Sequence, residues 1–98
     1  MRRETKFKKM FKKKLKRLYP ECIIVEADPT YFWSVPDVYF FLGSFWAALE
    51  FKRTEGSSRR PNQEYWVEVL DKMSFARFVY PGVEEEVLSE LEAAIQNR

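Results

Sequence analysis

Apolar residues near the N-terminus recur at helical spacing inside a strongly basic segment. They fall on one stripe of the predicted element: Phe7, Met10, Phe11, Leu15 and Leu18. This period predicts an amphipathic helix over about residues 3–18, because the stripe can pack on a core while the lysines stay in water. Pro20 favours a helix end just before it, since proline disfavours helical geometry in the preceding residue.

After Pro20 the pattern changes to short runs rich in β-branched and aromatic residues, which predict strands. The predicted strands are residues 22–26, 37–42, 45–53 and 75–80. Gly43-Ser44 fits a two-residue hairpin turn between the second and third strands. Helical periodicity returns over about residues 61–73 and 83–96. The order helix, three strands, helix, strand, helix predicts a single small α/β domain over residues 1–98, with a mixed sheet and a C-terminal helix.

Composition restricts the chemistry available to this domain. None of the 98 residues is histidine, which excludes His-based metal sites and Ser-His triads. Cys22 is the one cysteine, so the chain can form neither an internal disulfide nor a thiolate zinc cluster. We expect Cys22 to be a buried small hydrophobe in a reducing compartment. With no signal-like or membrane-spanning run, we expect a cytoplasmic protein (in the host cytoplasm if it is viral) that uses neither a membrane nor an organic cofactor.

The small net charge of +2 hides a strong asymmetry along the chain. Residues 1–18 contain ten Lys/Arg and one acid, whereas residues 19–98 contain seven Lys/Arg and fourteen acids. A basic block of this kind indicates a polyanionic partner, most often nucleic acid. The candidate phosphate contacts are Lys6, Lys9, Lys13, Arg59 and Arg60. The alternative, a solvated helix face that contacts nothing, stays open.

A two-residue turn would also fix the register of the predicted hairpin, so that Asp37 faces Glu50. Facing Cβ atoms in antiparallel strands lie about 4.5–5.5 Å apart, and two carboxylates there are unfavourable unless a divalent cation lies between them. Lys52 projects from the same face as Glu50, because strand side chains repeat every two residues. Two oxygen ligands with water suit Mg²⁺, and the lysine can hold or deprotonate a water. The alternative is an ordinary salt-bridged strand end.

Glu4 is the single acid of the basic segment, and it lies three residues before Phe7. That spacing places it on the apolar stripe of the predicted helix. It either complements the helix dipole in the first turn or directs a carboxylate into the protein, and the sequence leaves both open.

At these residues the sequence resembles the PD-(D/E)xK nuclease superfamily, and within it the small phage-type VRR-NUC and Holliday-junction-resolvase-like endonucleases. The matching elements are Pro36-Asp37, then Glu50-Phe51-Lys52 at the end of the following strand, then Pro61-Asn62-Gln63 opening a helix. Glu4 matches a glutamate that many members carry in their first helix. The likeness covers roughly residues 3–80, and Val35 departs from it, standing where members usually have glycine.

The resemblance implies a restriction-endonuclease-like fold with an αβββαβ core and a metal-dependent hydrolysis of DNA to 5′-phosphate and 3′-hydroxyl ends. The implied ligands of Mg²⁺ or Mn²⁺ are Asp37, Glu50 and the backbone carbonyl of Phe51. The resemblance also implies that Lys52 positions the attacking water and that Gln63 orients Lys52 or the water. Glu4 would complete the acidic cluster or support a second metal.

The same resemblance makes a homodimer an expectation, because resolvase-like relatives act as dimers. A non-catalytic nucleic-acid-binding protein on a nuclease-like scaffold is the alternative. The sequence leaves open the choice between DNA and RNA and the preferred structure of the nucleic acid, whether duplex, nick, flap, junction or single strand.

Overall fold

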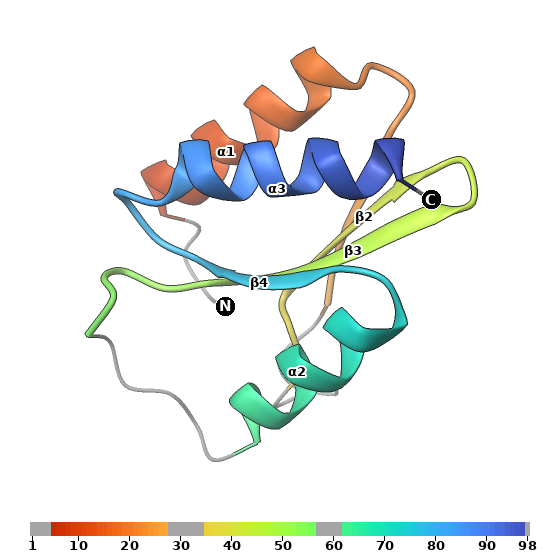
Figure 1. The fold of residues 1–98 in the computed structure, drawn as a ribbon. Coiled ribbons are helices and arrows are strands. Elements are labelled where there is room, and N and C mark those ends of the chain that lie inside the picture. The colour runs from red at the N-terminus through yellow and green to blue at the C-terminus, as the bar shows by residue number, and fades with distance from the viewer. Residues whose placement is uncertain (1–4, 28–34, 57–61, 98) are drawn as a thin grey trace.

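The described residues of the chain form three helices and a four-stranded sheet (Figure 1). The computed structural model describes residues 5–27, 35–56 and 62–97. The elements are α1 (Lys6–Leu18), β1 (Ile23–Glu26), β2 (Val38–Leu42), β3 (Phe45–Phe51), α2 (Gln63–Met73), β4 (Ala76–Val79) and α3 (Glu84–Gln96). Their order confirms the predicted small α/β domain with a C-terminal helix.

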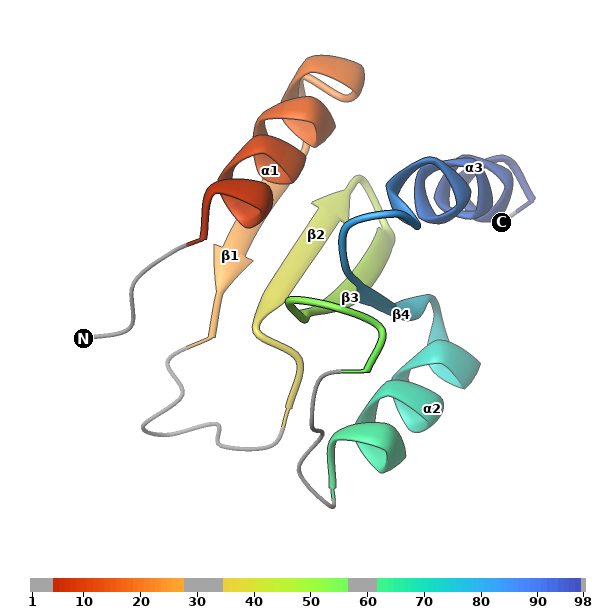
Figure 2. The same ribbon diagram turned by 90° about the vertical axis from the view of Figure 1, so that its left-hand side faces the viewer.

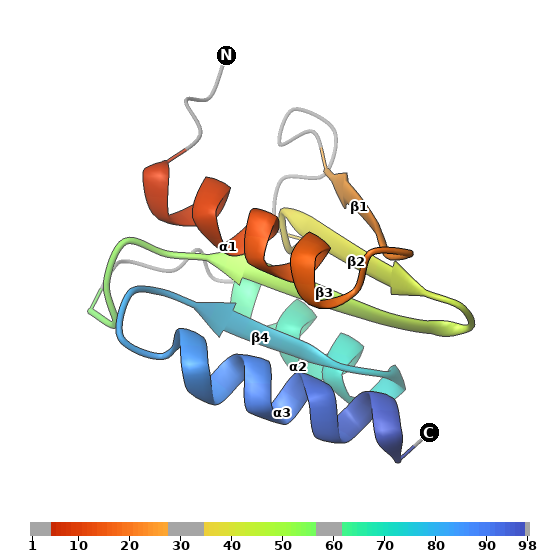
Figure 3. The ribbon, with the colours of Figure 1, turned by 90° about the horizontal axis from the view of Figure 1, so that it is seen from above.

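The sheet is mixed, with strand order β1-β2-β3-β4. The first two pairings are antiparallel and the pairing of β3 with β4 is parallel, which needs the crossover through α2. Figures 1 and 2 show α1 and α3 on one face of the sheet and α2 on the other. From above, α1 and α3 lie across the same face (Figure 3). The site described below lies at one end of this three-layer arrangement.

The hairpin has the predicted register. Leu42 pairs with Phe45 across the turn, and Val38 pairs with Leu49 at the other end of β2. Gly43 has a φ of 62°, a left-handed conformation that glycine adopts without a steric penalty. The two-residue turn therefore brings the start of β2 beside the end of β3.

Two hydrophobic clusters hold the layers together. The larger one packs α1 and α3 on the sheet and includes the fully buried Leu15, Phe40, Leu49 and Leu91. The smaller one lies under α2, around Ala48, Val67 and Ala76. Small residues on this second face allow α2 to pack close to β3 and β4, which is where Gln63 enters the site.

The basic and acidic helices are also in contact with each other. Lys14 Nζ of α1 lies 2.7 Å from Glu85 Oε2 of α3, and Tyr19, the residue after α1, donates a hydrogen bond to Glu92. Exposed ion pairs of this kind contribute little to stability, about 0–1 kcal/mol each. The Lys14–Glu85 pair nevertheless shows that part of the positive charge of α1 is balanced by the negative charge of α3.

Several element bounds and one helix face differ from the sequence prediction. The first helix begins at Lys6 rather than near residue 3, because Thr5 is its N-cap and its Oγ1 accepts the N–H of Lys8 at 3.1 Å. The inward stripe is also different. The buried residues of α1 are Lys8, Phe11 and Leu15, whereas Met10 and Leu18 are 61 % and 51 % exposed.

The remaining differences are small. The third strand ends at Phe51 instead of residue 53, and α2 begins at Gln63 instead of residue 61. The predicted Glu4, Arg59 and Arg60 lie outside the described residues. Across the parts of the chain that the structure describes, none of the helices is both long and apolar enough to cross a bilayer.

Leu15 tests how α1 is attached to the sheet. We expect Leu15→Ala to lower the free energy of unfolding by about 2–5 kcal/mol, because it leaves a cavity at a side chain with no exposed surface. Leu18→Ala makes the same chemical change at an exposed position of the same helix and should stay within about 0.5 kcal/mol of wild type. Urea denaturation measures both, and equal losses would contradict this assignment of the buried face.

Candidate active site

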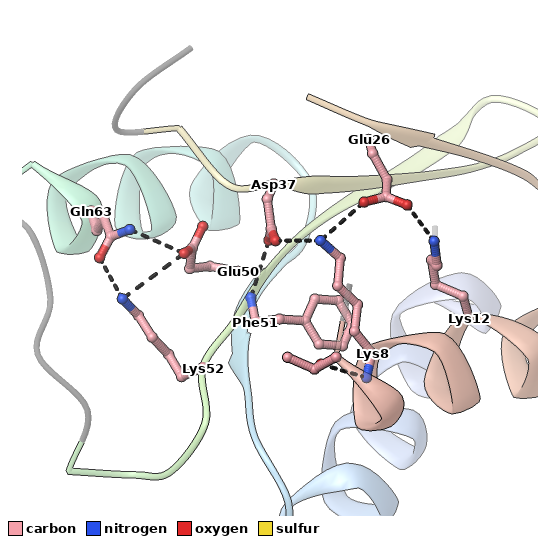
Figure 4. Close-up of polar contacts among 9 residues, drawn as sticks. Lys8, Lys12, Glu26, Asp37, Glu50, Phe51, Lys52 and Gln63 are labelled. Carbon is pink, nitrogen blue, oxygen red and sulfur yellow. Dashed lines mark hydrogen bonds and ion pairs between the residues drawn. The ribbon is translucent and has the colours of Figure 1, made fainter. Parts of the chain in front are cut away.

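Four polar side chains are nearly buried in the described part of the chain, and all four lie at one end of the sheet (Figure 4). They are Lys8, Asp37, Glu50 and Gln63, with exposed fractions between 3 and 7 %. They come from α1, from the residue before β2, from β3 and from the first turn of α2. Burying polar groups costs free energy unless each has partners, so the cluster depends on its internal contacts.

Asp37 completes the end of the hairpin. The N–H of Lys52 donates to Val79 of β4, so the N–H of the preceding Phe51 points to the opposite side, toward β2. β2 begins only at Val38, and Asp37 Oδ1 accepts the Phe51 N–H at 3.1 Å in place of a backbone carbonyl. The other carboxylate oxygen, Oδ2, accepts from Lys8 Nζ at 2.8 Å.

Glu50 belongs to a second group of contacts on the α2 side. Its Oε2 accepts from Gln63 Nε2 at 3.0 Å, and Lys52 Nζ lies 3.9 Å from the same oxygen. Lys52 Nζ also donates to Gln63 Oε1 at 2.6 Å. The two ends of the Gln63 amide therefore match an acceptor and a donor, which fixes its orientation. The structure brings together three residues that the sequence predicted for the site.

The carboxylates of Asp37 and Glu50 lie at the same end of the sheet but turn toward different partners. Figure 4 shows Asp37 directed at Phe51 and Lys8, and Glu50 directed at Gln63 and Lys52. Tyr39, two residues after Asp37, reports on both. Burial raises the pKa of its hydroxyl, and the charges of Glu50 and Asp37 raise that pKa further. Both carboxylates therefore act on the same small region of the β2–β3 hairpin.

Lys8 was missed by the sequence analysis. Its ammonium also lies 3.0 Å from Glu26 Oε1 of β1, and Lys12, one turn later on α1, binds the other Glu26 oxygen. Burial alone lowers the pKa of Lys8, but hydrogen bonds and charges from Asp37 and Glu26 raise it above its ordinary value. A signal existed in the sequence, because Lys8 lies three and seven residues before Phe11 and Leu15, on their helical stripe.

The donor types fit a magnesium or manganese ion. Asp37 and Glu50 offer hard carboxylate oxygens, and the Phe51 carbonyl points to the same side of its strand as the N–H that Asp37 accepts. Within the described ranges, which do not include Glu4, no three His, Cys, Asp or Glu side chains lie together so that they could hold a metal ion. A cation here would therefore have two carboxylates from this region, with the remaining ligands from backbone and water.

The charges of the cluster already balance. Among the described residues, its ion pairs join three carboxylates, those of Glu26, Asp37 and Glu50, to three ammonium groups, those of Lys8, Lys12 and Lys52. A divalent ion would thus enter a region of no net charge, where affinity is lower than in an uncompensated acidic pocket. Binding of an anion at the same time would restore the balance.

A cavity of about 530 Å³ opens beside this cluster. Its lining includes Lys8, Asp37, Lys52 and Arg53. Three cations around one carboxylate form a surrounding that suits a phosphate group. The cavity thus joins the proposed metal ligand to groups able to bind a phosphodiester.

A separate basic groove lies between α1 and β1. It is lined by Lys9, Lys12, Lys13, Lys16, Ile24 and Glu26. Two of the predicted nucleic-acid contacts, Lys9 and Lys13, line it, and Lys6 of the same helix is exposed. Glu26 is shared between this groove and the Lys8 contacts, so the basic face of α1 continues up to the buried cluster.

Comparison with known proteins adds no relative: no protein-family model, curated protein or solved structure matches this chain. The function must therefore be argued from the geometry of the site.

Glu26 makes the electrostatics of the cluster testable by pH. Burial raises the pKa of its carboxyl, but hydrogen bonds and charges from Lys12 and Lys8 outweigh burial and leave that pKa below its ordinary value of 4.5. A carboxyl with a depressed folded pKa contributes stability above its unfolded pKa, and the contribution disappears as pH falls through the folded value.

We therefore expect Glu26→Gln to destabilise the protein most near neutral pH and progressively less below about pH 4.5. Urea denaturation of wild type and variant across this pH range measures the difference in the free energy of unfolding. A difference that grows on acidification would contradict the sign of the shift.

Proposed function

We propose that this protein is a metal-dependent endonuclease of the PD-(D/E)xK type that hydrolyses phosphodiester bonds in DNA. The observation that carries the proposal is the Glu50–Gln63–Lys52 group, held beside the buried Asp37 at the open end of one hairpin. Ordinary salt-bridged strand ends lie in water, whereas Asp37, Glu50 and Gln63 are nearly buried. Asp37 and Lys52 also line a cavity to which Lys8 and Arg53 add further cations. A cluster of this kind is typical of a functional site.

Each residue has a defined place in the proposed reaction. Asp37, Glu50 and the Phe51 carbonyl would hold Mg²⁺ or Mn²⁺, with Glu4 as a proposed further ligand. The ion, when bound, would stabilise the charge that develops on the phosphate oxygens. Lys52 would hold the attacking water, and Gln63 keeps its ammonium in place through the 2.6 Å contact. Arg53 lines the cavity and would bind the substrate phosphate.

The basic face of α1 supports nucleic acid as the partner. Lys6, Lys9 and Lys13 are exposed, and the last two line a groove that continues toward the site. Arg59 and Arg60 remain proposed contacts with the nucleic acid. Cleavage leaving 5′-phosphate and 3′-hydroxyl ends, and a homodimer with two such sites, are further parts of the proposal.

One observation favours a second function, that of a non-catalytic nucleic-acid-binding protein. Asp37 and Glu50 both have cationic partners within the chain, so the folded cluster is balanced without a metal. A protein that only binds DNA could keep these contacts for stability alone. Cleavage assays separate the two functions directly.

Glu50 and Lys52 test the nuclease proposal. Glu50→Gln and Lys52→Met keep side-chain size and remove the charge, and each should reduce cleavage by at least about 100-fold, because one loses a metal ligand and the other the group that holds the water. The substrates are labelled duplex, single-stranded and four-way-junction DNA, in Mg²⁺, Mn²⁺ or EDTA.

Glu68→Gln is the matched control, because Glu68 is exposed on α2 and its ion pair is with the exposed Lys72 of the same helix. Circular dichroism checks that each variant is folded. An active Lys52→Met protein would overturn the role of this lysine. Binding of DNA without cleavage in either metal would favour the non-catalytic function.

The groove lysines test the binding face independently of catalysis. We expect Lys9→Met with Lys13→Met to weaken DNA binding across sequences and to lower the slope of log affinity against log salt by about 1 for each lost phosphate contact. Fluorescence anisotropy with EDTA present measures binding alone. Lys72→Met, at an exposed position of α2, is the control. An unchanged slope in the double variant would remove this groove from the interface.

A further inference from the structure

Lys8 is a buried cation of the cluster that the proposed reaction does not use. Its Nζ lies 2.8 Å from Asp37 Oδ2, 3.0 Å from Glu26 Oε1 and 5.9 Å from the centre of the Phe51 ring. Only 7 % of the residue is exposed. Lysine is seldom buried to this degree unless it is paired, so the position asks for an explanation beyond the surface charge of α1.

The ammonium of Lys8 lies close to the position that a metal bound to Asp37 would take. Asp37 Oδ1 is engaged by the Phe51 N–H, and Lys8 is on Oδ2. A divalent cation on the same carboxylate would be only a few ångströms from the ammonium, and like charges at such distances repel strongly in a buried site. Lys8 and the metal therefore compete for Asp37.

Glu26 gives Lys8 a partner that does not depend on Asp37. The Glu26 carboxylate contacts Lys8 through one oxygen and Lys12 through the other. If the ammonium leaves Asp37, it keeps this contact, so the displacement does not strand a buried charge. A short movement of this long side chain is enough to break the 2.8 Å contact with Asp37 while the contact with Glu26 remains.

A phosphate bound in the cavity would be an alternative partner for the Lys8 ammonium. Lys8 lines the same cavity as Lys52 and Arg53, so a phosphate bound there comes within its reach. That phosphate would attract the ammonium away from Asp37 and supply the negative charge that the balanced cluster lacks for a divalent ion. Two ligands that each favour the same arrangement strengthen each other's binding reciprocally.

We infer that Lys8 is a positioning residue of the active site. Its ammonium pairs with Asp37 in place of a metal until a substrate phosphate binds the ammonium, and Lys8 thereby couples metal binding to substrate binding. The inference rests on the proposed metal-dependent function. It predicts that the protein without DNA binds metal weakly because of Lys8 and not because its carboxylates are poor ligands.

The first test measures Mn²⁺ binding by calorimetry in the absence of DNA. Lys8→Met keeps the aliphatic stem and removes the ammonium, and it should bind Mn²⁺ at least about tenfold more tightly than wild type. Lys14→Met is the matched control, since Lys14 is on the same helix but pairs with Glu85 of α3, outside the cluster. Its affinity should stay within about threefold of wild type.

The melting temperature provides a second readout. A merely structural role of Lys8 would not make the variant gain more from Mn²⁺ than wild type does. In EDTA, Lys8→Met should melt below wild type, because the buried Asp37 has lost its cation. Addition of Mn²⁺ should raise its melting temperature more than that of wild type. Equal Mn²⁺ effects in both proteins, with equal affinities, would overturn the inference and leave the metal-dependent function standing. No Mn²⁺ binding by either protein would overturn both.

The second test measures the coupling itself. In a Lys52→Met background, which prevents cleavage, Mn²⁺ should strengthen binding of a labelled DNA duplex, as followed by anisotropy. Adding Lys8→Met should remove most of that effect, because metal binding at Asp37 no longer requires the DNA phosphate to displace an ammonium. An equal effect of Mn²⁺ with and without Lys8 would show that the lysine does not couple the two ligands.

Discussion

The burial of the Asp37 carboxylate is the constraint on which the rest of the site depends. A carboxylate that is only 6 % exposed must find donors within the fold, and here they come from two separate elements. The backbone of Phe51 supplies one and Lys8 of α1 supplies the other. The same contacts that make this burial tolerable therefore fix the end of the hairpin and the first turns of α1 relative to each other.

Glu50 has a matching but independent arrangement. It is held from the α2 side by Gln63, which also binds Lys52. Each carboxylate thus depends on a helix from a different layer, since α1 and α2 cover opposite faces of the sheet (Figure 2). The site lies where these layers meet at the end of the strands. The mixed sheet is what makes this possible, because the parallel β3–β4 pairing requires the crossover that carries α2 to its face.

Sequence reasoning was most successful where local rules determine geometry. The two-residue turn at Gly43-Ser44 determines the hairpin register, and strand periodicity then places Glu50 and Lys52 on one face. Gln63 came from the resemblance to a nuclease motif, and the structure places it between those two residues.

Lys8 shows where such reasoning fails. Periodicity assigns apolar residues to the core, so it counted Met10 and Leu18, which are exposed, and passed over a lysine at core spacing. The partner that makes its burial possible, Asp37, is 29 residues away in the chain and is brought near only by tertiary packing. The prediction of where α1 begins was wrong for a local reason instead, because the sequence analysis did not recognise Thr5 as the N-cap.

The hairpin turn has a consequence for how variants of this protein should be interpreted. Gly43 and Ser44 are exposed and lie at the closed end of the hairpin, about five residues or roughly 17 Å of strand from Asp37. An inserted residue there would slip the pairing by one and turn Glu50 and Lys52 away from Asp37. A change at a solvent-facing position remote from the candidate site would thus take the site apart, while a comparison of surface exposure or distance would class that position as tolerant.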